Sequence, residues 1–166
     1  MRLPETEACP VVHVALKLGS PGAHLSDEDV VEAHNAVTRR RGSVYLGKRG
    51  RPLKGKGHEL LDISIRQRNA SYLFLVRRSE RALSVFKAPL TRLLPLGERP
   101  PLDNVPGYYN DPDALFEIHT WFRVGILESV EPAELDKLTL LSNGNPLRRA
   151  LETSRTTMML ATEAKR

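Results

Sequence analysis

The chain has 166 residues, of which 40% are hydrophobic and 27% charged, so we expect a single globular domain, residues 1–166, with a sizeable core. A single cysteine, Cys9, excludes an internal disulfide and a multi-cysteine zinc site. No stretch is long and apolar enough to span a membrane, and the acids in MRLPETEACP do not suit a signal peptide, so we expect a cytoplasmic protein without a membrane partner.

The whole chain has a formal net charge of +5, and the positive charge is concentrated in one part of it. No acid lies between Glu32 and Glu59, whereas acids gather at 27–32 and 128–136. The basic residues of the acid-free stretch are Arg39, Arg40, Arg41, Lys48, Arg49, Arg51, Lys54 and Lys56. Such segregation favours an anionic partner, most often nucleic acid, although a solvated basic face without a partner would give the same pattern.

The first half of the chain predicts alternating strands and helices. Residues 11–18 alternate as in a strand, and a helix should begin at Ser26, end near Arg41 and stop at Gly42. A short strand at 43–46 follows. Residues 59–68 fit a helix or a strand, and we favour the helix. Two further strands are expected at 71–76 and 83–90, with their aromatic residues in the core.

The second half opens with a loop at 95–112 that is rich in proline and glycine, and loops of this length are often functional. Strand character returns at Leu115 and is strong over 120–130, where Trp121 and Arg123 should share the face opposite Phe122. A strand at 138–141, a turn at 142–145, a helical turn from Pro146 and a strand near 158–161 complete the chain, without an internal repeat.

The stretch GKRGRPLKGKG, residues 47–57, allows three interpretations. A phosphate-binding P-loop needs a hydroxyl residue after Lys56 to hold magnesium, and the chain has Gly57 there. Residues 49–52 match the core of an AT-hook, whose arginines enter the minor groove, but such hooks usually lie in disordered tails. The third interpretation, a basic loop between a strand and a helix that lines a nucleic-acid surface, fits the neighbouring elements best.

Two catalytic signatures begin in the sequence and are not completed. His58 and Glu59 open a zinc-protease HExxH motif, but Asp62 occupies the position of the second histidine. Near His119 a nuclease-like pattern has histidine where lysine is required. We therefore expect no catalytic residue, no metal and no cofactor. A small enzyme acting on RNA or nucleotides, with a site that the sequence does not reveal, is the alternative.

Four motifs in the C-terminal half resemble the PUA-like superfamily, especially the EVE and YTH branches and their relatives in bacterial modification-dependent restriction systems. They are residues 105–109 (VPGYY), 120–123 (TWFR), 138–142 (LTLLS) and 154–155 (SR). Residues 43–48 and 72–76 are similar to the first half of such domains. The resemblance implies an α+β fold: a twisted β-barrel of about five to seven strands, flanked by two or three helices. It also implies a non-catalytic nucleic-acid-binding module that reads a modified base flipped into an aromatic pocket. A nuclease or NTPase is the partner protein that it suggests.

The candidate site residues fall into two groups. Side chains expected to contact nucleic acid through charge are Lys48, Arg49, Arg51, Lys54, Lys56, Arg123 and Arg155. Those expected to form the base pocket are Tyr45, Tyr108, Tyr109, Trp121 and Asn143. Asn143, Arg155 and the position of Trp121 in its strand come from the resemblance. Trp121 could instead fill the core. The type of nucleic acid, the base recognised and an adaptor role that meets an acidic protein remain open.

Overall fold

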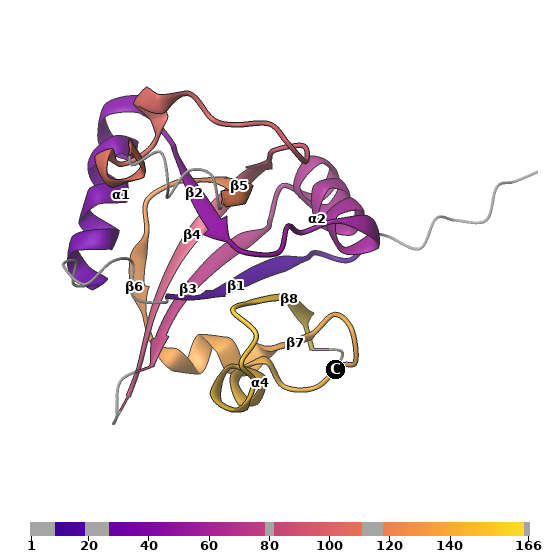
Figure 1. The fold of residues 1–166 in the computed structure, drawn as a ribbon. Coiled ribbons are helices and arrows are strands. Elements are labelled where there is room, and N and C mark those ends of the chain that lie inside the picture. The colour runs from indigo at the N-terminus through magenta and orange to yellow at the C-terminus, as the bar shows by residue number, and fades with distance from the viewer. Residues whose placement is uncertain (1–8, 19–26, 79–81, 111–117, 165–166) are drawn as a thin grey trace, which may run out of the picture.

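The computed structural model describes residues 9–18, 27–78, 82–110 and 118–164, and their fold is a mixed α/β structure built on one curled sheet (Figure 1). The strands are β1 (His13–Lys17), β2 (Val44–Arg49), β3 (Tyr72–Arg78), β4 (Leu83–Leu93), β5 (Ile118–Val124), β6 (Glu128–Val130), β7 (Leu138–Leu140) and β8 (Met158–Glu163). The α-helices are α1 (Asp27–Arg41), α2 (Gly55–Arg68) and α4 (Leu147–Thr153). Three 3₁₀ segments lie at η1 (Leu102–Asn104), η2 (Gly107–Asn110) and η3 (Pro132–Lys137). No helix in these described ranges could cross a membrane.

The eight strands follow the order β2-β5-β4-β3-β1-β8-β7, with β6 paired to β4 off this path. The β1–β3 pair is parallel and the other pairs are antiparallel. The end strands β2 and β7 do not pair with each other within the described residues, so the expected closed barrel is not confirmed, and the strands outnumber the five to seven anticipated. The mixed α/β character is confirmed.

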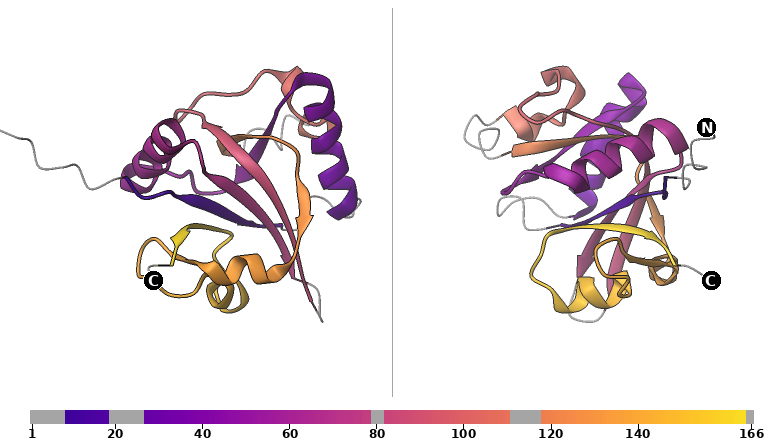
Figure 2. Two further views of the ribbon diagram at one scale, coloured as in Figure 1. Left: turned by 180° about the vertical axis from the view of Figure 1, so that it is seen from behind. Right: turned by 90° about the vertical axis from the view of Figure 1, so that its right-hand side faces the viewer.

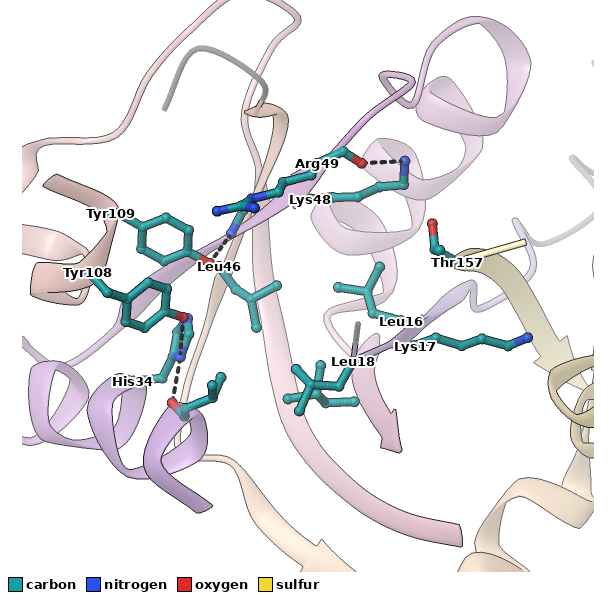
Figure 3. A pocket seen from close by; sticks show the side chains of 13 residues that line it. Leu16, Lys17, Leu18, His34, Leu46, Lys48, Arg49, Tyr108, Tyr109 and Thr157 are labelled. Carbon is teal, nitrogen blue, oxygen red and sulfur yellow. Dashed lines mark hydrogen bonds between the residues drawn. The ribbon is translucent and has the colours of Figure 1, made fainter. Parts of the chain in front are cut away.

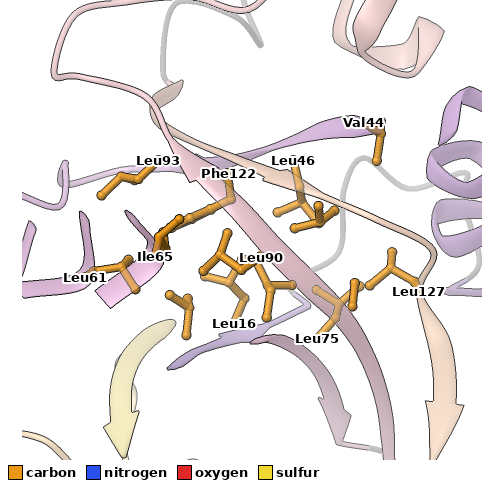
Figure 4. Packing of buried hydrophobic residues seen from close by; sticks show 14 of the residues in the cluster. Leu16, Val44, Leu46, Leu61, Ile65, Leu75, Leu90, Leu93, Phe122 and Leu127 are labelled. Carbon is orange, nitrogen blue, oxygen red and sulfur yellow. The ribbon is translucent and has the colours of Figure 1, made fainter. Parts of the chain in front are cut away.

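The sheet curls because β4 changes partner along its length. Its whole length runs beside β3 or β5, and its register with β5 shifts between Leu90 and Arg92. Such an irregularity bends a strand and increases its twist. As a result, the inner side chains of β2 and β5 face those of β1 and β3 across a buried cluster (Figure 4). Leu61 and Ile65 of α2 pack into the same cluster.

The helices lie around this curled sheet. α1 and α2 lie at opposite ends of the inner cluster, to which both contribute side chains, and α4 lies on the outer side of β1 and β3 (Figures 1 and 2). There Leu147 and Leu151 join a second buried cluster with Phe74 and Met159. Asn35 fixes α1 because its side-chain amide donates to the Leu127 carbonyl at 3.0 Å and its Oδ1 accepts from the Leu127 N–H at 2.8 Å.

Several expected boundaries are different in the structure. α2 begins at Gly55 rather than at residue 59, and β2 continues to Arg49 rather than ending at residue 46. The stretch 120–130 contains two strands instead of one, because the Gly125 N–H donates to the Pro89 carbonyl at 3.0 Å and the chain then turns to pair with the other half of β4. Ser26 and the strand start at Leu115 lie outside the described residues.

The third buried cluster is aromatic, and it joins the proline-rich loop to the sheet. It contains Tyr45, Leu94, Val105, Tyr109, Ile118 and Trp121. Trp121 of β5 pairs in register with Gly47 of β2, and its ring lies directly against the Gly47 backbone. A Cβ atom at Gly47 would lie 2.7 Å from Ile118 Cγ2 and 2.8 Å from Trp121 Cζ3, which is closer than real side chains approach. Only glycine fits this position without a shift of its neighbours.

We therefore expect Gly47→Ala to lower the free energy of unfolding by about 1–3 kcal/mol, the usual cost of forcing an extra methyl group into a packed core. Urea denaturation measures this change. Gly107→Ala is the control, because a Cβ atom there would meet no atom within 4 Å and the residue has no positive φ. Equal stability of the Gly47→Ala variant and wild type would contradict the packing described.

Candidate functional site

A cavity of about 210 Å³ opens between the C-terminal end of β1, the strand β2, and α1 (Figure 3). Its apolar wall consists of Leu16, Leu18, Val30, Leu46 and Leu75. Its remaining lining residues are Lys17, His34, Gly47, Lys48, Arg49, Tyr108, Tyr109 and Thr157. The cavity exists because β2 is an edge strand, so the curl of the sheet leaves it facing β1 without pairing to it.

Tyr108 and Tyr109, from η2, form the aromatic wall of the cavity. Their ring centroids are 4.5 Å apart, and Tyr109 meets the ring of Trp121 edge-on at 5.3 Å. The Gly47 N–H donates to the Tyr109 hydroxyl at 3.1 Å, which satisfies a backbone group of the edge strand. Tyr109 is buried, whereas Tyr108 is half-buried. Tyr108 is thus the aromatic side chain with surface left for a ligand.

His34 supports Tyr108 from below and is itself 1% exposed. Its Nδ1 lies 2.8 Å from the Val30 carbonyl, which can only accept, so Nδ1 carries the proton. Nε2 is then free to accept from the Tyr108 hydroxyl, 3.3 Å away. Burial lowers the pKa of His34 to about 4, and burial raises the pKa of the Tyr108 hydroxyl above its usual range. At neutral pH both groups are uncharged.

Trp121 and Tyr45 lie behind this wall rather than in it. Trp121 is 1% exposed and Tyr45 6%, so neither ring offers an open face for a base. The predicted gathering of Tyr45, Tyr108, Tyr109 and Trp121 is present, but the Trp121 side chain packs beneath Tyr109. The reason is that the proline-rich loop covers the strand face expected to be open. Within the described residues, Trp121 Nε1 has no hydrogen-bond partner.

Two lysines line the cavity, Lys48 from β2 and Lys17 from β1 (Figure 3). Lys48 Nζ donates to the carbonyls of Arg51 at 2.7 Å and Arg49 at 3.2 Å, which fixes the loop after β2. Lys17 Nζ donates to the Ser154 carbonyl, which ties β1 to the segment before β8. Burial lowers the pKa of both lysines, and for Lys17 the nearby Arg78 lowers it further.

Several exposed cations lie beside the cavity. Among the residues that the structure describes, none of Arg49, Arg51, Lys54, Lys56 and Arg155 forms an ion pair. Some cations elsewhere do, in the pairs Arg39–Glu32, Arg41–Asp103, Arg66–Asp62, Lys87–Glu134 and Arg148–Asp136. The first turn of α2 contains no acid either. This surface therefore has an uncompensated positive potential.

Two expected site residues lie away from the cavity. Arg123 donates through Nε to the Thr91 hydroxyl at 3.0 Å, where β5 meets β4. Asn143 is exposed in the turn after β7, at the opposite end of the strand order from β2, and its Oδ1 accepts from the Asn145 N–H at 2.9 Å. The structure thus brings together Lys48, Arg49, Tyr108 and Tyr109 at one cavity.

The sequence did not indicate three polar residues that line the cavity: Lys17, His34 and Thr157. Their distance from one another along the chain hides their proximity, and a single histidine on a helix gives no ligand spacing.

The described residues contain no group of three or more His, Cys, Asp or Glu side chains that could hold a metal ion. Comparisons of the chain with protein-family models, curated proteins and solved structures find no match.

The buried histidine predicts a pH dependence of stability. The folded-state pKa of His34 is about 4 and its ordinary value is 6.5, so between these limits the unfolded chain binds more protons. Stability should fall as the pH drops through this window, by up to about 1.4 kcal/mol per pH unit for this residue.

Denaturant unfolding of wild type, His34→Gln and His119→Gln between pH 7 and 4 gives the pH dependence of the unfolding free energy for each. His13, whose pKa burial also lowers to about 4, contributes in the same direction in all of them. His34→Gln should therefore flatten the dependence without abolishing it. His119→Gln, at an exposed position, should retain the wild-type slope. An unchanged slope in His34→Gln would show that His34 does not titrate as described.

Proposed function

We propose that the protein is a non-catalytic nucleic-acid-binding module that holds one base in the cavity beside Tyr108 and the sugar-phosphate backbone on the adjacent basic surface. The observation that carries this proposal is the junction of the two features. Lys48 and Arg49 line the cavity from one side, and the exposed cations Arg51 and Lys54 of the β2–α2 connection continue from them. Phosphate contacts position a nucleic acid, while contacts to the base provide specificity.

The cavity suits one small planar ligand. Its volume of about 210 Å³ is below the range of about 300–1,000 Å³ typical of drug-sized ligands. The Tyr108 ring can stack on a base, and every base offers a face for stacking. Leu16, Leu46 and Leu75 supply an apolar wall against which a methyl group on the base would pack. This wall supports the modified-base reader implied by the PUA-like resemblance.

The conformation of the basic loop favours contact with phosphates over the AT-hook mode of binding. An AT-hook presents its arginines from an extended segment, whereas this loop connects β2 directly to α2 and is held by the bonds from Lys48 to its carbonyls. Gly50 and Gly55, with φ of +85° and +67°, make turns at its two ends.

A module of this kind needs an enzyme to act on its target. The resemblance implies a nuclease or NTPase as that partner, and we place the protein in the cytoplasm.

The basic surface predicts a strong dependence of affinity on salt. Each phosphate contact adds about 0.7–0.9 to the slope of log affinity against log salt. The quadruple variant Arg49→Ala, Arg51→Ala, Lys54→Ala, Lys56→Ala should therefore lower this slope by about 3 and weaken binding to all sequences alike. Fluorescence anisotropy at salt concentrations from about 50 to 200 mM measures this slope.

A matched quadruple variant removes the same charge elsewhere: Arg66→Ala, Arg68→Ala, Lys137→Ala, Arg149→Ala, all at exposed positions. Its slope should stay close to that of wild type. Equal losses in the two variants would mean that only the net charge matters. A loss restricted to A·T tracts, caused by Arg51→Ala alone, would favour the AT-hook.

Tyr108 tests the base-holding role. The ligand is the tightest binder from a panel of oligonucleotides with methylated and unmethylated adenine and cytosine. Stacking contributes about 1–3 kcal/mol per base, so Tyr108→Ala should weaken this binding roughly 5- to 150-fold. Tyr108→Phe keeps the ring and should stay near wild type. Both variants should keep the wild-type circular dichroism spectrum. Unchanged binding by folded Tyr108→Ala would refute base stacking in this cavity.

A further inference from the structure

A second hollow, distinct from the cavity, lies where α2 approaches β7, β8 and α4. Its volume is about 690 Å³, and its floor is apolar: Leu60, Leu140, Leu141, Met158, Met159 and Leu160. Its polar lining residues are Lys56, Ser142, Ser154 and Thr156. We call it the α2–β8 groove. It shares no lining residue with the cavity.

The cavity and the α2–β8 groove nevertheless share their bounding segments. The end of β2 supplies Lys48 and Arg49 to the cavity, and the first turn of α2, a few residues further along the chain, supplies Lys56 to the groove. The segment at 154–158 supplies Thr157 to the cavity and Thr156 to the groove. This segment is held against β1, because the Lys17 N–H donates to the Thr157 carbonyl at 2.8 Å and Lys17 Nζ donates to the Ser154 carbonyl. The two hollows are therefore consecutive along the same pair of chain segments.

Unpaired positive charge follows both segments. Arg51 and Lys54 lie in the connection between the cavity-lining and groove-lining residues, and Arg155 lies in the segment opposite. All three side chains are exposed, and none forms an ion pair among the described residues. A chain of phosphates could follow these cations from one hollow to the other.

We propose that the α2–β8 groove holds a second base of the same strand, so that the ligand is single-stranded and contacts the protein at two bases joined by phosphates on the basic surface. This inference rests on the proposed function. Single-stranded ligands fit because their unpaired bases can leave the stack and enter separate hollows, which the bases of an intact duplex cannot do. The groove offers Met158 for contact with the base, and a thioether sulfur packs well against an aromatic ring.

The test compares single strands of two to eight nucleotides, oligo(dT) and oligo(U), by anisotropy or calorimetry. Two variants obstruct the groove at exposed positions: Ser142→Trp fills it, and Thr156→Glu places negative charge at its rim. Thr153→Glu, exposed on α4 and absent from the groove lining, is the control with the same charge change. In wild type and in Thr153→Glu, affinity should rise at least tenfold as the strand lengthens from two to eight nucleotides.

In Ser142→Trp and Thr156→Glu this rise should shrink to threefold or less, while dinucleotide binding stays as in wild type. A rise that persists in both groove variants would overturn the second subsite and leave the proposed function standing. Equal affinity of wild type for a duplex and for single strands of the same length would also overturn it. Absence of binding to every oligonucleotide, including the methylated panel, would overturn the proposed function itself.

Discussion

The contact between the Trp121 ring and the backbone of Gly47 is the constraint on which the site depends. It holds the edge strand β2 flat against the aromatic cluster, where the Tyr109 hydroxyl accepts from the Gly47 N–H. Tyr109 is thereby fixed, and Tyr108 is placed beside the cavity with His34 behind it. The same strand carries Lys48 and Arg49 to the cavity mouth. One packing contact therefore positions both the aromatic wall and the first cations.

The region beside the cavity contains several neighbouring cations without an acidic partner. Arg39 of α1, Arg66 of α2 and Arg148 of α4 do have such partners, and exposed pairs of this kind contribute little to stability. The cations of the β2–α2 connection have no such partners among the described residues. An anion lying across them would relieve their mutual repulsion. The nucleic acid that we propose would supply both this anion and a base for the aromatic cavity.

Local sequence patterns predicted most elements but not how they cover one another. The end of α1 was predictable because Gly42, with φ of +87°, stops it. α2 begins earlier than expected, because its first turn of weak helix formers packs closely at Gly57 against the side chains of Leu53 and Leu160. Alternation correctly separated Trp121 from Phe122, yet it could not reveal that a distant loop covers Trp121. Charge singles out Lys48 and Arg49 in the sequence, and the proline-rich loop and the resemblance single out Tyr108 and Tyr109. Lys17 and His34 required the tertiary structure, because only the curl of the sheet brings them together.

In the proposed complex, a base enters the cavity while its backbone lies on the adjacent cations. A heteronuclear NMR titration of nitrogen-15-labelled protein with the tightest-binding oligonucleotide would locate this contact. The amide resonances that we expect to move most are those of residues 16–18, 46–49, 108–109 and 157, which line the cavity. Binding that leaves these resonances in place and moves others, such as those of η3 and the outer face of α4, would contradict the proposed contact.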